Sequence, residues 1–128
     1  SPAADGAQIR AMQALARGVP IAGHITSFTA RLVKATHPED PESPAVVRRF
    51  VRYGASPRGM QAMILAGKII ALLDGRYTVA FDDIRAAAVP ALRHRLILNF
   101  EAQAEGMRPD QVIGEILKEV VPEAVGAQ

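Results

Sequence analysis

The sequence predicts an all-α fold, a bundle of five or six helices with no significant sheet. Apolar residues make up 49% of the chain, but there are no Trp and only four Phe and two Tyr, so small and aliphatic side chains must build the core. Such residues favour packed helices over strands. Apolar positions also recur at helical spacing in several segments, with Gly or Pro at their ends. We expect one domain over residues 1–128, ordered at about residues 9–120.

The first two helices are defined by their apolar stripes and by the residues at their ends. One helix is expected over Gly6–Arg17, capped by Asp5 and stopped by Gly18. Its predicted buried stripe consists of Ile9, Met12 and Leu15. The second helix begins at Pro20 and ends at the His37-Pro38 pair. Its apolar face comprises Ile21, Ile25, Phe28, Leu32 and Ala35.

A polar, proline-rich loop at 39–44 leads into a stretch with two interpretations. Residues 45–53 fit a short helix, but part of the same stretch also alternates as a strand would. We favour a short helix that becomes irregular before Gly54. The next helix, over 56–74, is apolar nearly all round, as expected of a central helix buried by its neighbours.

Acidic residues, prolines and glycines predict the bounds of the remaining elements. Gly75 ends the central helix, and Asp82 and Asp83 lie in the first turn of the next helix, where acids complement the helix dipole. Pro90 is expected to interrupt that helix, which then continues in kinked or restarted form. A compact connector is expected over 99–106, and a last helix begins at Pro109.

The segment 54–59 carries the clearest candidate site. Ser56 is a favoured N-cap residue and Pro57 suits the first helical position, because its missing N–H would be unpaired there. Arg58 then lies at the second helical position, where free N–H groups and the helix dipole favour an anion. An arginine at this place suits a phosphate or a carboxylate, although composition alone equally allows an ion pair with a nearby acid.

Several other kinds of site and partner are excluded or disfavoured. The chain has no Cys, which excludes disulfides and thiolate metal sites, and its three His lack metal-ligand spacing. Gly67-Lys68 lacks the rest of a phosphate-binding loop, and no paired acid and base stand out. The net charge of +2 requires no polyanionic partner. We expect no metal, no nucleic acid, no membrane span and a cytoplasmic location.

Arg93-His94-Arg95 forms a local basic cluster. Its simplest interpretation is a solvated face. The alternative is a contact surface for a neighbouring subunit or an acidic partner.

Tyr53 to Gly59 resembles the sensor 2 motif of the MoxR family of AAA+ ATPases. The likeness continues through the helix that follows, 66–76, through Val79–Ile84, and through Leu92-Arg93-His94-Arg95 with 99–102. This resemblance implies the C-terminal helical lid of such an ATPase, without the nucleotide-binding core. It departs from the family at Gly59, where many members have Ala, and at Ala80 and Arg108, where a capping hydroxyl is frequent.

The resemblance implies a role in ATP hydrolysis for the full-length protein. The lid would close over ATP and Mg²⁺ bound to the core, and the sensor 2 arginine, Arg58, would reach the γ-phosphate. The implied nucleotide-binding residues are Gly54, Ala55, Ser56, Pro57 and Arg58. Alone, the chain is expected to bind no nucleotide tightly and to be inactive.

The resemblance also implies partners. These are the protein's own AAA+ core, further copies in a homo-oligomeric ring (commonly a hexamer) and a von Willebrand factor A-domain protein, in chaperone-like assembly or metal insertion. Two other hypotheses remain: a free-standing helical protein–protein interaction module, and a small helical nucleic-acid binder.

Overall fold

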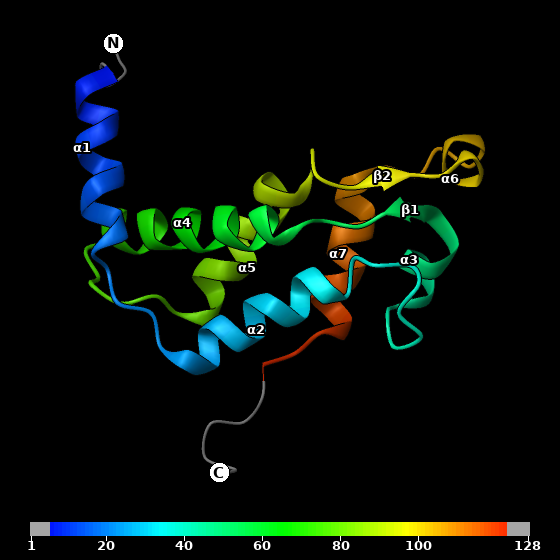
Figure 1. Cartoon of the computed structure of the whole chain (residues 1–128), viewed down its shortest axis with the longest axis horizontal. Coiled ribbons are helices and arrows are strands. Elements are labelled where there is room, and N and C mark those ends of the chain that lie inside the picture. Colours follow the sequence, from blue (N-terminus) through cyan, green and yellow to red (C-terminus); the bar gives the residue numbers. More distant parts are fainter. Residues whose placement is uncertain (1–5, 123–128) are drawn as a thin grey trace.

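The computed structural model describes residues 6–122, which form seven helices and two short strands (Figure 1). The helices are α1 (Gly6–Arg17), α2 (Gly23–Lys34), α3 (Ala45–Phe50), α4 (Pro57–Leu73), α5 (Phe81–Leu92), α6 (Phe100–Ala104) and α7 (Pro109–Glu119). The strands are β1 (Val51–Tyr53) and β2 (Ile97–Leu98). The all-α prediction is confirmed, and the additional helix is α6, which forms within the predicted connector. The predicted cap Asp5 lies outside the described residues.

The helix α4 lies at the centre and packs against α1, α2 and α5. Its buried residues form one stripe, which consists of Gly59, Met63, Gly67 and Ala71. The prediction that α4 is buried nearly all round is therefore wrong, and Leu73 at its end is 72% exposed. Small residues in the stripe allow α5 to approach closely, since a Cβ on Gly67 would lie 3.0 Å from Ile84 Cδ1.

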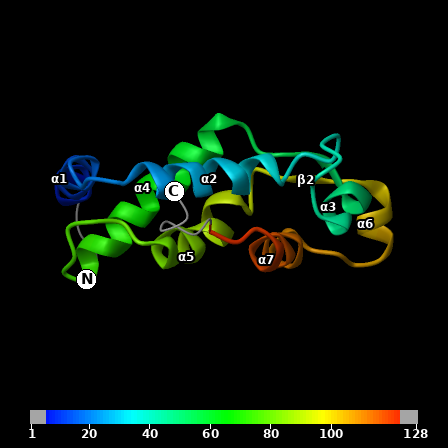
Figure 2. The same ribbon diagram turned by 90° about the horizontal axis from the view of Figure 1, so that it is seen from below.

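The helix α1 stands to one side of the bundle and crosses α4 near its C-terminal end (Figures 1 and 2). Its predicted buried stripe is wrong, because Ile9 is 47% exposed and Leu15 is 58% exposed. The side chain of Met12 lies outside what the structure describes. Among the described residues of α1, Ala16 is the buried one. The core is instead built by α2, α4, α5 and α7, through Phe28, Leu32, Met63, Ile84, Leu92, Ile113 and Ile116.

The ambiguous stretch 45–53 contains a helix followed by a strand. α3 ends at Phe50, and β1 pairs antiparallel with β2, with Val51 opposite Leu98 and an irregularity before Tyr53. The backbone N–H of Asn99 extends the pairing by donating to the Phe50 carbonyl at 2.8 Å. Both sequence interpretations were therefore partly right, since the stretch is helical at first and extended at its end. Local sequence could not decide between them, because the partner strand β2 lies far along the chain.

The helix α5 runs through Pro90 and ends at Leu92. The predicted interruption is wrong. Pro90 and Ala86 are both exposed, so water can reach the carbonyl that the missing N–H would have bound. After Leu92 the chain turns and enters β2 without restarting a helix.

The connection between α4 and α5 is held by an ion pair. Gly75 ends α4 as predicted, with φ of 75°. Arg76 donates to both carboxylate oxygens of the buried Asp83, at 2.8 and 2.6 Å, and Asp83 also accepts from the Ala80 N–H at 2.7 Å. Asp83 thus caps α5 where Ala80 offers no hydroxyl, while Asp82 remains exposed. The hydrogen bonds from Arg76, aided by the Ala80 N–H, lower the pKa of Asp83 below its ordinary value.

Candidate functional site

The start of α4 has the predicted geometry. Ser56 is the N-cap residue, with extended backbone (φ −86°, ψ 175°), and its hydroxyl accepts the Arg58 N–H at 3.3 Å. Pro57 is the first helical residue, so Arg58 occupies the second position. All three residues are exposed. The first turn of α4 therefore presents Arg58 to solvent from a capped and conformationally restricted helix end.

Thr36 and His37, which follow the C-cap of α2, hold the segment before this turn, and we call this pair the α2 clamp. The Thr36 hydroxyl accepts the Ala55 N–H at 2.9 Å, and His37 Nε2 donates to the Ala55 carbonyl at 2.8 Å. Thr36 is fully buried, and its hydroxyl in turn donates to the Val33 carbonyl at 2.6 Å. Both polar groups of the Ala55 backbone are thus fixed by two adjacent residues that directly follow the end of α2.

Gly54 leaves no space for a side chain against this clamp. A Cβ at Gly54 would lie 2.6 Å from the Thr36 carbonyl oxygen and 2.8 Å from Thr36 Oγ1. Ala55 is fully buried beside it. Of the five predicted binding residues, Gly54 and Ala55 therefore face α2 and set the position of the segment, whereas Ser56, Pro57 and Arg58 face outward.

The guanidinium group of Arg58 is available for a ligand. Within residues 6–122 its side chain makes no hydrogen bond and no ion pair with an acid. Several other arginines are engaged: Arg49 binds Glu101 and Glu105, Arg76 binds Asp74 and Asp83, and Arg93 binds Asp110. The ion pair with a nearby acid that composition allowed is therefore not formed among the described residues. An exposed arginine of this kind can bind a phosphate or a carboxylate bidentately.

The structure divides the Arg93-His94-Arg95 cluster. Arg93 donates to both oxygens of Asp110 on α7, at 2.9 Å each, and this contact lowers the pKa of the Asp110 carboxyl. Arg95 instead lies against the first turn of α4, with its Cδ 3.4 Å from where a Cβ on Gly59 would be. The sequence grouped these arginines by proximity, but only Arg95 is brought to the candidate site.

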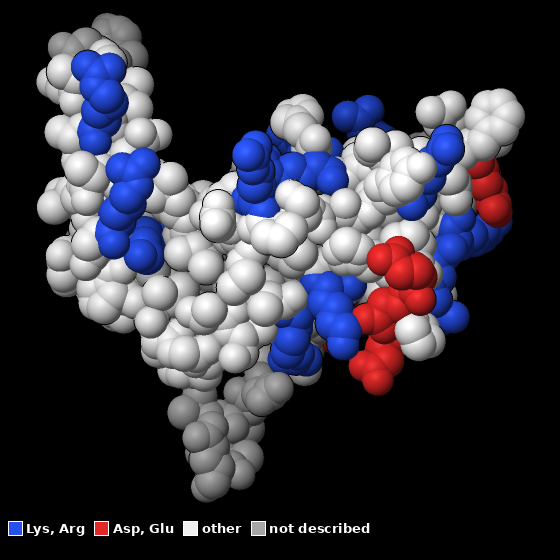
Figure 3. All heavy atoms as spheres, in the orientation of Figure 1, with Lys and Arg blue, Asp and Glu red and all other residues white. Residues whose placement is uncertain are grey.

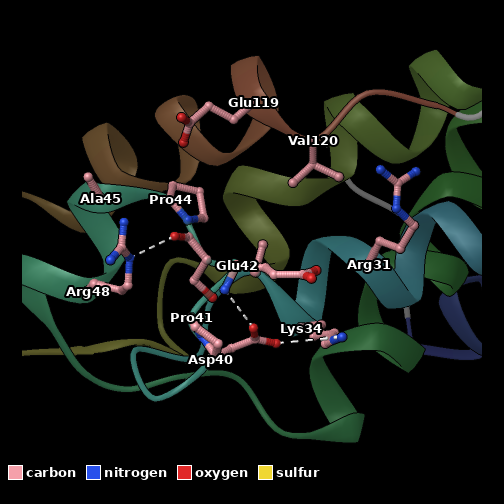
Figure 4. Close-up of a pocket in the computed structure, with 12 residues that line it drawn as sticks. Arg31, Lys34, Asp40, Pro41, Glu42, Pro44, Ala45, Arg48, Glu119 and Val120 are labelled. Atoms are coloured by element: carbon pink, nitrogen blue, oxygen red, sulfur yellow. Dashed lines mark hydrogen bonds and ion pairs between the residues drawn. The ribbon is translucent and has the colours of Figure 1, made fainter.

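One pocket of about 620 Å³ lies elsewhere, among α2, α3, α7 and the loop 37–44 (Figure 4). None of its lining residues belongs to 54–59. Its basic groups are already engaged: Lys34 pairs with Asp40 at 3.6 Å, Arg48 donates to the Ser43 carbonyl, and Arg31 donates to the Val121 carbonyl. The pocket therefore offers no group comparable with the free guanidinium of Arg58.

Two further classes of feature are not found in the described part of the chain. Residues 6–122 contain no cluster of three or more His, Asp or Glu side chains arranged to hold a metal ion. No helix within the same range combines the length and apolar character that a membrane span requires.

Sequence reasoning missed the α2 clamp and the placement of Arg95. The local signal for the clamp was weak, because Thr36 and His37 stand at a helix end where polar residues are ordinary. Gly54 was a partial signal, since a glycine before an N-cap residue suggests close approach of another segment. Neither observation indicates which segment approaches.

The AAA lid domain family matches residues 44–116 of this chain. The chaperone MoxR1 of Mycobacterium tuberculosis is 33% identical over 103 residues, which cover 80% of this chain and 27% of that protein. Protein MoxR of Paracoccus denitrificans is 40% identical over 63 residues, which cover 48% of this chain and 19% of that protein. The chain thus spans less than a third of the length of each of these curated relatives.

A solved structure has the same fold. The crystal structure of a candidate ATPase from Cytophaga hutchinsonii matches with a TM-score of 0.81 at 31% identity. The match covers 91% of this chain and 34% of that one. Its aligned region therefore extends well beyond the span matched by the family.

Proposed function

Because this chain belongs to the AAA lid domain family and is the helical lid of a MoxR-type AAA+ ATPase, we propose that it closes over ATP bound by a core domain of the same protein. In this proposal Arg58 contacts the γ-phosphate. The observation that carries it is the free, exposed guanidinium of Arg58 on a capped helix turn whose approach segment is fixed by the α2 clamp. Such an arginine stabilises negative charge on a transferred phosphoryl group.

The residues of this chain fit a triphosphate but not its metal. Arg58 supplies donors for phosphate oxygens, while the described residues offer no acidic cluster for magnesium. We therefore assign the Mg²⁺ ligands and the remaining phosphate contacts to the core domain. Magnesium would supply charge neutralisation at the phosphates, and this chain would orient Arg58 and cover the nucleotide. Alone, the chain would bind ATP weakly and hydrolyse none.

Closure would couple phosphate contact to movement. The α2 clamp and the close α4–α5 seam join Arg58 to the body of the lid, so that gain or loss of the γ-phosphate would rotate the lid as a unit. We extend the proposal to a homo-oligomeric ring, a hexamer, that acts in chaperone-like assembly or metal insertion beside a von Willebrand factor A-domain partner. The family supports this extension by analogy. Light scattering on the full-length protein with and without ATP would test the ring.

The proposal is tested by ATP turnover of the full-length protein with Arg58→Ala. We expect kcat to fall about 100-fold, less than the 10³–10⁵ that a supplied arginine finger contributes in other phosphoryl-transfer enzymes. Arg108→Ala is the matched control, because Arg108 is also exposed. Its backbone is engaged at the start of α7, but its side chain makes no hydrogen bond and no ion pair within residues 6–122. Unchanged turnover for Arg58→Ala, with an unchanged circular dichroism spectrum, would refute the assignment.

One observation favours a second function, the interaction module. Ile9 and Leu15 leave an apolar strip of α1 uncovered within residues 6–122. In our proposal the same strip attaches the lid to its core. An interaction module would bind its partner equally well with and without ATP and would need no core domain. The lid, by contrast, would act only when joined to a nucleotide-binding core.

A further inference from the structure

The turn after α5 brings a second arginine to the start of α4. A backbone hydrogen bond closes this turn, in which the Arg95 N–H donates to the Leu92 carbonyl at 2.9 Å. The Arg95 side chain then lies back against α4. Gly59 makes the approach possible, since a Cβ there would lie 3.1 Å from Leu92 Cδ2 and 3.4 Å from Arg95 Cδ. Arg95 therefore packs beside the residue that directly follows Arg58.

Arg95 keeps most of its hydrogen-bond donors free. It is exposed, and its Nη1 donates to the Ala91 carbonyl at 3.2 Å. Its Nε and Nη2 have no acceptor among the described residues, and no carboxylate pairs with it. Arg93, two residues earlier, is by contrast bound to Asp110 through two of its nitrogens. Of the two arginines in this turn, only Arg95 can take up a new anion without breaking an ion pair.

Positive charge therefore gathers at one junction. Lys and Arg side chains cluster where the N-terminal end of α4 meets the C-terminal end of α5, with no Asp or Glu side chain visible among them on this face (Figure 3). Uncompensated arginines at close quarters repel one another, and a polyanion relieves that repulsion. The oxygens of a polyphosphate chain can accept bidentate hydrogen bonds from two arginines at once.

We infer that Arg95 is a second phosphate-contacting arginine, which binds the same polyphosphate as Arg58, and that Gly59 provides the space for it. The inference rests on the proposed function. It assigns Arg95 a role in nucleotide affinity and in discrimination between triphosphate and diphosphate. It leaves Arg93 as a residue that joins α5 to α7.

The test is equilibrium binding of a non-hydrolysable ATP analogue and of ADP to the full-length protein, by titration calorimetry. Arg95→Gln removes the charge and is expected to weaken binding of the analogue about 10- to 100-fold, the range for a hydrogen bond to a charged group. Arg93→Gln is the matched control. It removes the same charge two residues before Arg95, but from a guanidinium that is already bound to Asp110. We expect it to leave analogue affinity within about twofold, which would exclude a general effect of net charge.

A second variant tests the geometry without touching either arginine. Gly59→Ala places a methyl group against Leu92 and the Arg95 stem, so we expect it to weaken analogue binding by a few-fold. Combined with Arg95→Gln, it should add little further loss, since both changes affect one contact.

The outcomes separate this inference from the proposed function. If Arg58→Gln weakens analogue binding but Arg95→Gln does not, the inference is overturned and the proposed function stands. If neither variant changes binding or ATP turnover, both fail. Thermal unfolding of Arg95→Gln identifies a folding defect, and Arg95→Lys, which retains the charge, should then recover part of the affinity.

Discussion

Gly54 sets how closely the segment before Arg58 can approach α2. The space that a Cβ would need is occupied by backbone atoms of Thr36, at 2.6 Å for the oxygen and 2.8 Å for the carbon, and backbone atoms cannot rotate aside. We therefore expect Gly54→Ala to lower the free energy of unfolding by about 1–3 kcal/mol, as overpacking does. Urea unfolding of the chain, followed by circular dichroism, measures this.

Gly114 is the matched control for that substitution. It lies inside α7, and nothing lies within 4 Å of a Cβ placed there. Gly114→Ala should therefore stabilise the chain by about 0.5–1 kcal/mol through helix propensity. If Gly54→Ala were equally stabilising, the close contact between Gly54 and α2 would be wrong, and with it the description of the α2 clamp.

At this scale, local rules predicted the cap geometry at the start of α4 well and the contacts that support it poorly. Ser56, Pro57 and Arg58 took their predicted positions because capping chemistry acts between residues next to one another in sequence. Thr36 lies well before Ala55 in the chain, and no pattern in a single sequence states that its hydroxyl binds that N–H. The same limit explains why Arg93 and Arg95 were grouped, although α7 engages only the first.

At the scale of the elements, the stability of the connection that leads from the end of α4 to the start of α5 depends on pH. The pKa of Asp83 in the folded chain lies below its ordinary value of 3.8, chiefly because Arg76 donates to it. The stabilisation is therefore complete above the ordinary value and is lost as pH falls through the folded-state pKa. We expect Asp83→Asn to cost about 1–3 kcal/mol at pH 7, and the difference from wild type to shrink steadily below about pH 4. Urea unfolding across that pH range checks this.

Asp82 is the matched control for this junction. It stands next to Asp83 in the first turn of α5 but is exposed. Asp82→Asn should lose only the dipole contribution, about 0.3–1 kcal/mol. Equal effects for the two substitutions at pH 7 would show that Arg76 contributes nothing beyond dipole compensation.

The elements also show where periodicity is sufficient. Helices α1, α2, α4 and α7 were predicted close to their observed bounds, because caps and apolar spacing are local. Burial was less predictable. The apolar surface of α4 indicated burial on all sides, yet only the stripe facing α5 is fully buried within the described residues, although α1 and α2 also contact this helix. Pro90 was predicted to interrupt α5, but an exposed proline costs a helix less when water replaces the lost hydrogen bond.

Considered as a whole, the molecule has a dense centre and an outlying helix. The core of α2, α4, α5 and α7 is continuous, whereas α1 crosses α4 at one end and presents Ile9 and Leu15 to solvent (Figures 1 and 2). The apolar periodicity of α1 predicted a buried stripe that residues 6–122 do not cover. A partner surface that covers this stripe would therefore have to come from outside these residues. Under the proposed function that partner is the core domain, and α1 is the part of the lid that attaches to it.

This attachment predicts that Leu15→Gln has little effect in the isolated chain but destabilises the full-length protein. In the chain of residues 1–128, the substitution should change the free energy of unfolding by no more than about 0.5 kcal/mol, because Leu15 is already 58% exposed. In the full-length protein it should destabilise the lid–core contact by about 1.5–3 kcal/mol, the value of burying a leucine. Thermal unfolding of both proteins measures the contrast.

Phe100→Gln is the matched control for Leu15→Gln. Phe100 is 87% exposed on α6, which lies at the opposite end of the molecule from α1 (Figure 1). We expect it to leave lid–core attachment unchanged, because α6 is remote from the surface that carries Leu15. If Leu15→Gln left the full-length protein as stable as Phe100→Gln does, α1 would not be the attachment surface. If it destabilised the shorter chain instead, the Leu15 side chain would be buried within this domain and would not be free for the core domain.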